Sequence, residues 1–421
     1  MTRILRLSGK VFSRGSSYAP ASVYGIILPM KKSNDYSGFI IAFAFFALII
    51  SSLVLFNRER EKESVAENRM LSQFPKIEDL NPMSVSEYRK ELSAWFEDNL
   101  GLRDQYLTLS GILKYNLLHR AKTSKVEIGR DCFLYLADEG NLELETSKSA
   151  EFMEKLPEYA KVQQEISDKL KLQGIDYVFM IAPGKPAIYP ENISSSDHVV
   201  TDTIGDAMYD YLTDNTNVHA YWPKDILLEA KDNEAGEALY LKTDTHWTTY
   251  GRNIAYRDLI DTMNSWGFTD AKPADVRFYE SEDPYIGDLS NMMGPVTWTG
   301  KWLEEEDFLD WEVAAPKARV IDQGEEYDRF HEMLLRKNVY NPDLCAIFHN
   351  DVVPGKKVLI CGDSMVGVCI LPELAECFSD MTFIWSYSID QDFIDFVQPD
   401  IVISEFGERE LKLRLDAIKG F

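Results

Sequence analysis

One serine in the chain stands where nucleophilic catalysis would place it. Ser364 lies in Cys361-Gly362-Asp363-Ser364-Met365, after an apolar run typical of a buried strand and before a helical pattern. Such a position predicts the carboxyl edge of a parallel sheet, where α/β folds bind ligands. Amides at the start of the helix could stabilise an oxyanion there. The alternative is that Asp363 or Ser364 only caps the helix.

An Asp-x-His pair supplies the other groups that such a serine needs. Asp244 and His246 stand in Thr243-Asp-Thr-His-Trp247. A serine is a weak nucleophile that needs a base, and the base needs an orienting acid. In an extended segment residues two apart face the same side, so Asp244 could hold one imidazole nitrogen while the other faces Ser364. The alternative is a lone loop histidine, with Asp244 capping the next helix.

Four further residues are candidates for substrate contacts. Trp247 could stack on a sugar ring or pack in the core. Lys185 could contact an anionic substrate, although closing a turn after Pro183 is the favoured interpretation. Asn350 could help to orient the site, and Arg409 could bind a carboxylated sugar or pair with nearby acids. The five cysteines form no CxxC pair or Cys/His cluster, so we expect no metal, and the chemistry requires no cofactor.

The elements that must position these residues alternate between strand and helix. This rhythm indicates an α/β fold with a doubly wound parallel sheet and helices on both faces. A hairpin is expected over 126–136, and two helices around Gly101. Strands are predicted at 176–182, 357–362, 382–385 and 400–404, and helices at 158–173, beginning near Pro157, 201–214, 224–231, 248–265, 366–378, 391–397 and 408–418.

One stretch near the N-terminus predicts a membrane anchor. Residues 38–56 carry no charge, and a helix of this length would be about 28 Å long, close to a bilayer hydrocarbon core. A buried core helix would have a polar face, and a signal peptide would have a shorter apolar run with a cleavage site. Cations before the stretch are opposed only by Asp35, whereas Arg58, Arg60 and Lys62 alternate with acids. We therefore expect a single-pass protein of the cell membrane with a cytoplasmic N-terminus and an extracytoplasmic catalytic domain.

The length and composition of the chain limit its possible binding partners and suggest how it is divided into parts. With 421 residues, 45% hydrophobic, the chain is long enough for one large domain and additional segments. The net charge of −25 argues against a nucleic-acid partner. Three tryptophans among many acids suggest an insertion at 296–345. The expected parts are a cytoplasmic segment 1–37, a transmembrane helix 38–56, a juxtamembrane linker 57–83 and a catalytic domain 84–421 that includes the insertion.

Seven short motifs, taken together and in order, resemble one family over most of residues 67–418. The family is that of the SGNH-hydrolase-like O-acetyltransferases of the alginate AlgX/AlgJ type, including the DHHW proteins. We expect the chain to be closer to the AlgJ-like form, because the sequence shows no obvious carbohydrate-binding module after the catalytic domain. Met365 departs from the aromatic residue that often follows the serine. The motifs are Glu67-Asn68-Arg69, Trp95 to Asp104, Ala182 to Lys185, Thr243 to Trp247, Gly287-Asp288-Leu289, Gly362-Asp363-Ser364, and Glu405 with Glu408-Arg409.

The resemblance implies an SGNH/flavodoxin-like fold and a set of roles. Ser364 would be the nucleophile, His246 the general base and Asp244 the residue that orients it. The reaction would be transfer of an acetyl group to a hydroxyl of a cell-surface or exported polysaccharide through an acetyl-serine. A membrane-bound O-acyltransferase would supply the acetyl group. A carbohydrate acetylesterase with the same triad, or a non-catalytic scaffold of a polysaccharide export complex, remains the alternative.

Overall fold

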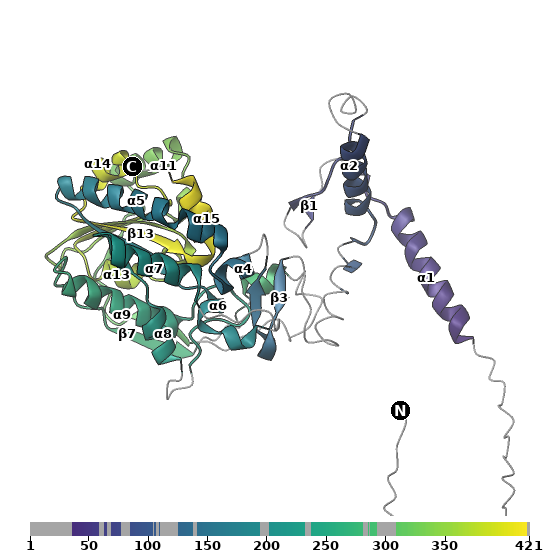
Figure 1. Cartoon of the computed structure of the whole chain (residues 1–421), viewed down its shortest axis with the longest axis horizontal. Coiled ribbons are helices and arrows are strands. Elements are labelled where there is room, and N and C mark those ends of the chain that lie inside the picture. Colours follow the sequence, from purple (N-terminus) through teal and green to yellow (C-terminus); the bar gives the residue numbers. More distant parts are fainter. Residues whose placement is uncertain are drawn as a thin grey trace, which may run out of the picture. The chain divides into compact units, whose positions relative to one another are not determined.

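The chain is described from a computed structural model (Figure 1). It divides into two compact units, Met1–Val54 and Leu55–Phe421. Of the predicted cytoplasmic segment 1–37, residues 1–35 lie outside the described residues. The structure describes residues 36–58, 63–64, 69–76, 85–103, 105–106, 109, 125–137, 141–193, 202–231, 237–280, 285, 287–292 and 309–418.

The first unit is described through one helix. Helix α1 (Ser37–Val54) is uncharged and covers most of the stretch 38–56. Many of its large apolar side chains are exposed, among them Phe39 and Phe43. Across the described residues, no helix is both long enough and apolar enough to cross a membrane.

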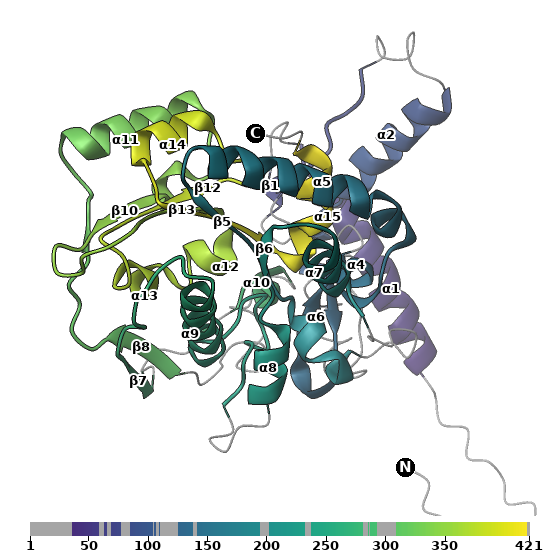
Figure 2. The same ribbon diagram turned by 60° about the vertical axis from the view of Figure 1, so that its left-hand side comes forward.

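The second unit is built on a seven-stranded sheet with the order β6-β5-β13-β11-β12-β10-β9 (Figure 2). The five strands from β6 to β12 are parallel to their neighbours, whereas β10 is antiparallel to β12 and β9 is antiparallel to β10. These strands are β5 (Asp176–Ala182), β6 (His219–Tyr221), β9 (Arg319–Val320), β10 (Ala346–His349), β11 (Lys357–Gly362), β12 (Asp380–Trp385) and β13 (Ile401–Gly407).

The expectation of a wholly parallel sheet is therefore wrong, and the sheet is mixed. The loop 350–356 leads from β10 directly into β11 without a helix. A parallel neighbour needs a crossover of about a dozen residues or more, so this short connection brings the chain back in the opposite direction. The four strands predicted from apolar runs are all present, as β5, β11, β12 and β13.

Helices cover both faces of the sheet, as expected. Alternate residues of β5 enter two different hydrophobic clusters, with Val178 and Met180 on one face and Phe179 and Ile181 on the other. Figure 2 shows α5, α11 and α14 along one side of the sheet, and α9 and α13 along the other. These helices are α5 (Ala150–Leu172), α9 (Thr249–Ser265), α11 (Glu325–Arg336), α13 (Leu371–Ala375) and α14 (Gln391–Val397).

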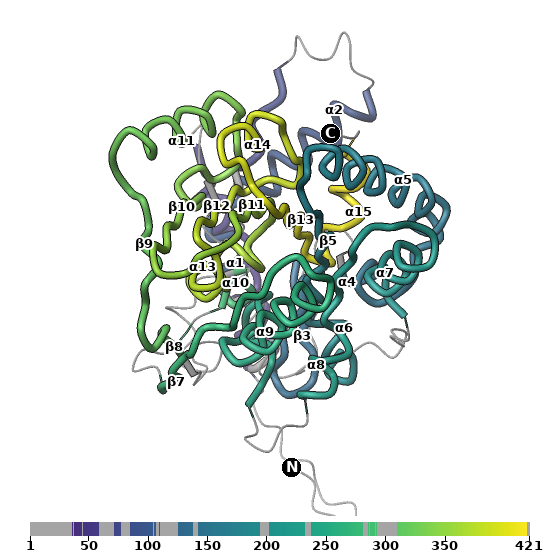
Figure 3. Tube along the Cα trace, turned by 90° about the vertical axis from the view of Figure 1, so that its left-hand side faces the viewer, coloured from purple at the N-terminus to yellow at the C-terminus, as the bar shows by residue number. Residues whose placement is uncertain are grey.

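The second unit contains further, smaller elements, and the tube in Figure 3 follows their order along the chain. The hairpin predicted over 126–136 is present as β3 and β4, which pair antiparallel. The remaining elements are β1 (Glu63–Ser64), β2 (Arg69–Met70), α2 (Val85–Asp98), β3 (Val126–Ile128), β4 (Leu134–Leu136), α4 (Asn141–Thr146), α6 (Lys185–Ile188), α7 (Ile204–Asn215), α8 (Lys224–Ala230), β7 (Val276–Glu280), α10 (Asp288–Met292), β8 (Leu309–Val313), α12 (Ser364–Gly367) and α15 (Glu408–Ala417).

The predicted start of one helix is wrong. Helix α5 begins at Ala150 rather than near Pro157, which lies inside the helix. Phe152 and Leu156 are buried together with Tyr159 and Ala160. Their helical spacing extends the core-facing stripe to the N-terminal side of the proline. Burial of this stripe outweighs the tendency of Pro157 to end the helix.

The helix predicted over 366–378 is in fact two short helices. Helix α12 ends at Gly367, and α13 begins at Leu371 with Pro372 in its first turn. Proline is well tolerated in the first turn of a helix but not inside a longer one. Only a single turn of helix therefore follows the serine, and the corner after it buries Met365, Val366, Cys369 and Ile370 while Val368 is exposed.

The insertion expected at 296–345 is part of the main fold where it is described. Strand β9 pairs with β10 at the edge of the sheet, and Phe330 of α11 is buried in the core. Residues 293–308, with Trp298 and Trp302, lie outside the described residues. In the expected linker 57–83, β1 and β2 pair antiparallel, so its described part contains regular structure.

Candidate active site

Ser364 follows the carboxyl end of the central strand β11. Asp363 caps the short helix α12, because its Oδ1 accepts a hydrogen bond from Met365 N at 2.8 Å. Its Oδ2 accepts another from Gly407 N at 2.9 Å, which ties the turn to the end of β13. The cap predicted as an alternative is therefore present, but Asp363 provides it. Ser364 Oγ is left to face the histidine.

The structure brings together the three residues predicted to form a triad. His246 Nε2 lies 2.8 Å from Ser364 Oγ, across 118 positions of sequence. His246 Nδ1 lies 2.6 Å from Asp244 Oδ1, and the backbone N of His246 donates to the same oxygen at 2.9 Å. Asp244 is buried, whereas the His246 side chain is 19% exposed. This arrangement lets the imidazole take a proton from the serine while the carboxylate holds the other nitrogen.

Asp244 is held in its anionic form by several donors. Its Oδ2 accepts hydrogen bonds from Tyr285 Oη at 2.7 Å and from Asp288 N at 2.9 Å. Burial acts to raise the pKa of Asp244, but the hydrogen bonds from His246, Tyr285 and Asp288 N hold that pKa well below the usual carboxyl range. A stable negative charge next to Nδ1 favours the imidazolium that forms when His246 takes a proton.

A close contact between two backbone segments positions the residues that donate to Asp244. Gly287 packs against Thr243, and a Cβ on Gly287 would lie 2.0 Å from Thr243 O. Only glycine permits this contact, which brings Tyr285 and Asp288 up to the carboxylate. The Gly287-Asp288-Leu289 motif marked this loop in the sequence. No sequence signal pointed to Tyr285, whose partner is 41 positions away.

Asp244, His246 and Asp288 lie close enough to be considered as a metal site, with ligand atoms within 4.8 Å of one another. The oxygens of Asp288, however, accept hydrogen bonds from Thr245 N at 2.9 Å and Thr245 Oγ1 at 2.6 Å. Those of Asp244 accept from His246, Tyr285 and Asp288 N. Hydrogen-bond donors thus occupy the oxygens that a cation would need, and they account for the cluster without an ion.

A cleft of about 780 Å³ opens beside the serine. Arg409, the last residue of the late motif, lines it and places Nη2 3.4 Å from Ser364 Oγ. Of the four residues predicted to contact substrate, Arg409 is the one that the structure places in this cleft. The other residues that line it are Lys337, Asn338, Val339, Tyr340, Asp363, Trp385, Ser386, Tyr387, Ser388, Asp390, Phe393, Glu410 and Arg414.

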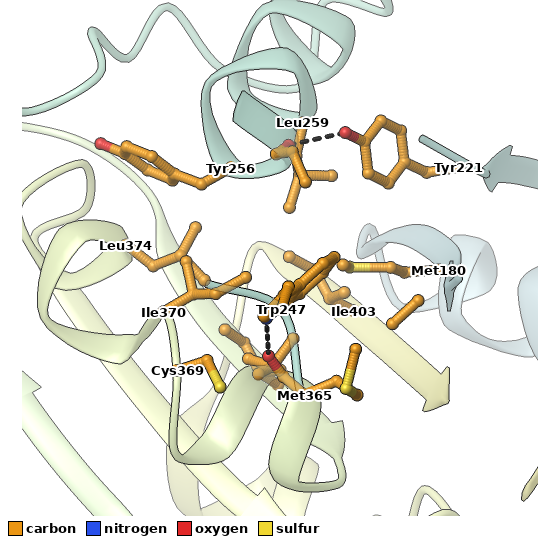
Figure 4. Packing of buried hydrophobic residues seen from close by; sticks show 14 of the residues in the cluster. Met180, Tyr221, Trp247, Tyr256, Leu259, Met365, Cys369, Ile370, Leu374 and Ile403 are labelled. Atoms are coloured by element: carbon orange, nitrogen blue, oxygen red, sulfur yellow. Dashed lines mark hydrogen bonds between the residues drawn. The ribbon is translucent and has the colours of Figure 1, made fainter. Parts of the chain in front are cut away.

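Trp247 is a core residue and not a platform for a sugar. Its side chain is 2% exposed, and its Nε1 donates to Met365 O at 3.1 Å. Figure 4 shows the ring among Met180, Ile370 and Ile403, with the dashed bond to Met365. Trp247 therefore joins the histidine segment to the residue that follows the nucleophile, and the prediction that it stacks on substrate is wrong.

Lys185 also acts from within the fold. It is buried, and its Nζ donates to the carbonyl oxygens of Leu241 at 2.9 Å, Lys242 at 3.0 Å and Asp244 at 2.6 Å. These bonds fix the backbone that carries the Asp-x-His pair. The structural interpretation of Lys185 is therefore favoured over contact with an anionic substrate.

Asn350 is placed at the opposite edge of the sheet from Ser364. Its backbone N donates to Ser379 O, just before β12, at 2.8 Å. Because β10 is antiparallel to β12, its carboxyl end lies beside the start of the parallel strands and not their ends. The sequence neighbourhood of β11 suggested a role at the site, and the reversed direction of β10 removes the basis for it.

Glu405 supports the nucleophile turn from behind. It is fully buried on β13, and its Oε2 accepts from Asp363 N at 2.9 Å. Burial raises the pKa of Glu405 well above the usual carboxyl range, and the nearby charge of Asp363 raises it further. Gly362 allows the contact, because a Cβ there would lie 2.5 Å from Glu405 Oε2. Glu405 thus positions the serine without touching it.

Comparison with known proteins identifies similar domains and a shared fold. Residues 126–329 match the family described as SGNH hydrolase-like domain, acetyltransferase AlgX. Residues 126–329 are thus similar to an AlgX-type SGNH hydrolase-like domain. The matched range includes Asp244 and His246 and ends before Ser364. The family resemblance drawn from the motifs is confirmed, and with it an SGNH-like α/β fold around a mixed sheet.

Curated relatives that the chain matches are probable alginate O-acetylases. The probable alginate O-acetylase AlgJ of Pseudomonas fluorescens is 27% identical over 206 residues, which are 48% of this chain and 49% of the relative. That of Pseudomonas putida is 25% identical over 201 residues, 48% and 50% of the two chains. The chain thus spans about half the length of the curated relatives it matches.

A solved structure supports the fold assignment. PatB1 of Bacillus cereus matches with a TM-score of 0.50 at 14% identity, over 67% of this chain and 95% of PatB1. At this identity the match shows a shared fold and does not identify the substrate.

Proposed function

We propose that this protein is an O-acetyltransferase that moves acetyl groups onto hydroxyls of a cell-surface or exported polysaccharide through an acetyl-serine. The observation that carries the proposal is the hydrogen-bonded series Asp244–His246–Ser364 at the wall of an open cleft. The match to an acetyltransferase family, with relatives that are probable alginate O-acetylases, supports the choice of acetyl transfer.

In the first half-reaction Ser364 takes the acetyl group from its donor. His246 Nε2, 2.8 Å from Ser364 Oγ, accepts the hydroxyl proton as Oγ bonds to the acetyl carbonyl carbon. The tetrahedral intermediate collapses, the bond to the donor oxygen breaks, and the imidazolium returns its proton to that oxygen. Asp244 stabilises the imidazolium through Nδ1.

In the second half-reaction a sugar hydroxyl replaces the serine. His246 Nε2 accepts the hydroxyl proton while the sugar oxygen bonds to the carbonyl carbon of the acetyl-serine. The bond from that carbon to Ser364 Oγ then breaks, and Oγ regains a proton from the imidazolium. The enzyme returns to its starting state, and the glycan carries the acetyl ester.

Arg409 is the residue best placed to stabilise the developing negative charge. Its Nη2 is 3.4 Å from Ser364 Oγ, so an oxyanion built on the acyl carbon would form next to a guanidinium. Helix α12 is too short to supply a strong dipole, and Met365 N is already bonded to Asp363. We therefore assign Arg409 a larger share of this stabilisation than the helix.

An acetylesterase is the second candidate, because the same triad could pass the acetyl group to water. The acetylesterase is favoured by the cleft, because the cleft is open to solvent at Ser364. The non-catalytic scaffold is less well supported, since it would give no use to the aligned Asp244, His246 and Ser364.

We further propose that residues 38–56 anchor the protein in the cell membrane with the second unit outside the cytoplasm. The support is the uncharged sequence of the stretch, the cation bias before it, and the apolar side chains exposed along α1. Acetyl-coenzyme A is absent outside the cytoplasm, so a membrane-bound O-acyltransferase is the proposed supplier of the acetyl group.

An acceptor-dependence assay tests the proposal. The full chain is incubated with an acetyl ester donor, with and without oligosaccharide, and both acetate and acetylated glycan are measured. Glycan acetylation that depends on Ser364 supports the transferase. Rapid release of acetate without any acetylated glycan would support the esterase instead.

A further inference from the structure

The cleft beside Ser364 has an aromatic corner that the acetyl chemistry does not use. Trp385 ends strand β12, and Tyr340 follows helix α11, so the two come from elements far apart in the sequence. Their ring centroids are 6.3 Å apart with an angle of 65° between the planes. Both residues line the same cleft as the nucleophile. A ligand bound in this cleft could therefore contact an aromatic surface and Ser364 at once.

Tyr340 is held outward by the backbone around it. Its side chain is 72% exposed, more than Tyr279 on β7 at 43%. Asn338 and Asn341, on either side, have φ of 51° and 50°. Asparagine tolerates this left-handed region better than most residues, so the sequence specifies two sharp turns around Tyr340. The loop thus presents the tyrosine ring at the cleft rather than burying it.

Phe393, a further aromatic residue of the cleft, is buried, and the fourth, Tyr387, is engaged with the fold. Its ring stacks on Phe406 at 5.6 Å, and the guanidinium of Arg414 lies 4.4 Å from the ring centroid. Its hydroxyl donates to Asp363 Oδ2 at 3.2 Å. Tyr387 therefore belongs to the wall of the cleft, and the accessible aromatic surface is that of the exposed Tyr340 and the half-buried Trp385.

The charges of the cleft are balanced. Three cations and three anions line it, Lys337, Arg409 and Arg414 against Asp363, Asp390 and Glu410. Two of the cations already have partners within the fold. Lys337 pairs with Asp390 at 2.8 Å, and Arg414 pairs with Glu410 at 2.9 Å. A polymer with a carboxylate on every sugar would find no surplus of positive charge along these residues.

We propose that Tyr340 and Trp385 form an acceptor subsite for an uncharged pyranose ring of the polysaccharide. The inference rests on the proposed transferase function and adds the class of acceptor to it. The apolar C–H face of a pyranose suits an exposed aromatic ring, while its hydroxyls remain available to the polar residues of the cleft. One ring held here would direct the hydroxyl of a neighbouring part of the chain toward the acetylated Ser364.

The test compares two acceptors and several variants of the full chain. The acceptors are a neutral cello- or chito-oligosaccharide and an oligouronate of similar length, with p-nitrophenyl acetate as donor. We expect wild type to acetylate the neutral acceptor with the higher kcat/KM. Tyr340→Ala should raise KM for that acceptor about tenfold, the loss of one good ring contact. Tyr279→Ala, which removes an exposed tyrosine outside the cleft, should leave KM unchanged.

A second readout separates the subsite from the catalytic groups. Tyr279→Ala, which lies outside the cleft, should hydrolyse p-nitrophenyl acetate without acceptor at the wild-type rate. Tyr340→Ala should lose far more of its acceptor-dependent transfer than of this hydrolysis. Trp385→Ala should act on the acceptor KM in the same way, and Trp385→Phe should restore part of it. If Trp385→Ala does not fold, Tyr340→Ala decides alone, because its side chain is largely exposed.

The outcomes distinguish failure of the inference from failure of the proposed function. A wild type that prefers the oligouronate, or a Tyr340→Ala variant with unchanged KM for the neutral acceptor, overturns the subsite while leaving the transferase standing. Release of acetate with neither glycan acetylated overturns both.

Discussion

His246 and Ser364 meet at 2.8 Å between Nε2 and Oγ although 118 positions separate them in the chain. The contact depends on two buried connections away from the reacting atoms. Trp247 bonds to Met365 O, and Lys185 holds the backbone at Asp244. The Asp-x-His loop and the nucleophile turn are thereby fixed to one another. The site is therefore set by the fold before any substrate binds.

The first prediction concerns the carboxylate that orients the histidine. Asp244→Asn should lower kcat by about 10³–10⁴-fold, because the amide can no longer accept from Nδ1 as an anion. Tyr285→Phe removes one hydrogen bond to the same carboxylate and should cost only about tenfold. Steady-state kinetics on an acetyl ester measure both. Equal losses in the two variants would contradict the division of roles between Asp244 and Tyr285.

The second prediction concerns Glu405 behind the nucleophile turn. Glu405→Gln should preserve stability, since the pKa of Glu405 is raised by burial and glutamine has the shape of the neutral acid. Glu405→Ala leaves the buried Asp363 N without its acceptor and should cost about 1–3 kcal/mol of unfolding free energy. Urea denaturation measures this, with Glu280→Gln on an exposed strand as control. A large loss in Glu405→Gln would mean that the buried group is anionic.

The third prediction concerns the pH dependence of stability. Burial raises the pKa of Glu373 to about 8, that of Glu145 to about 8 and that of Glu408 to about 7, from an ordinary value of 4.5. The folded state then keeps protons that the unfolded state releases above pH 4.5. Their contribution to stability is therefore fully present below that pH and is lost as pH rises through about 8.

Urea denaturation at pH 5.5 and pH 8.5 measures this loss. The wild type should be less stable at the higher pH, with a contribution from Glu373 of the order of 3 kcal/mol. Glu373→Gln should lessen the drop, because it removes one of the groups that must ionise. A wild type that gains stability between these two pH values would contradict the prediction.

The main strands could be predicted because their apolar runs are local. Strands β5, β11, β12 and β13 are nearly continuous stretches of buried residues, and Ser364 lies in a short motif directly after β11. Asp244 and His246 could be found because they form a short motif of their own, before α9. The antiparallel strand β10 was missed because its direction depends on the length of the loop to β11. Tyr285, Tyr340 and Trp385 were missed for a related reason, since each acquires its place only through residues distant in sequence.

The candidate contacts of Trp247 and Asn350 show the same limit. A tryptophan next to a histidine is compatible with a sugar-binding site and with a place in the core. Only the contact of Trp247 with Met365 decides between the two. Asn350 is near β11 in the chain but at the wrong edge of the sheet. Ser364 was placed correctly because the direction of β11 could be predicted. Asn350 was misplaced because the reversed direction of β10 could not.

The fourth prediction concerns topology. Protease added to intact protoplasts should digest the second unit, Leu55–Phe421, if residues 38–56 anchor it outside the cytoplasm. Cation asymmetry around an uncharged stretch usually determines this orientation. A cytoplasmic protein in the same cells, cleaved only after lysis, serves as the control. Protection of the unit until lysis would contradict the proposed localisation.

The central claim is that Ser364 carries the acetyl group, and the most direct measurement is peptide mass spectrometry after rapid acid quenching of the full chain with an acetyl ester. The account predicts one acetyl group on the peptide that contains Ser364 in wild type. It predicts none on that peptide in Ser364→Ala, and a loss in His246→Ala as large as in the double variant, since serine and histidine act as a unit. Persistent labelling elsewhere together with wild-type turnover in Ser364→Ala would contradict the account.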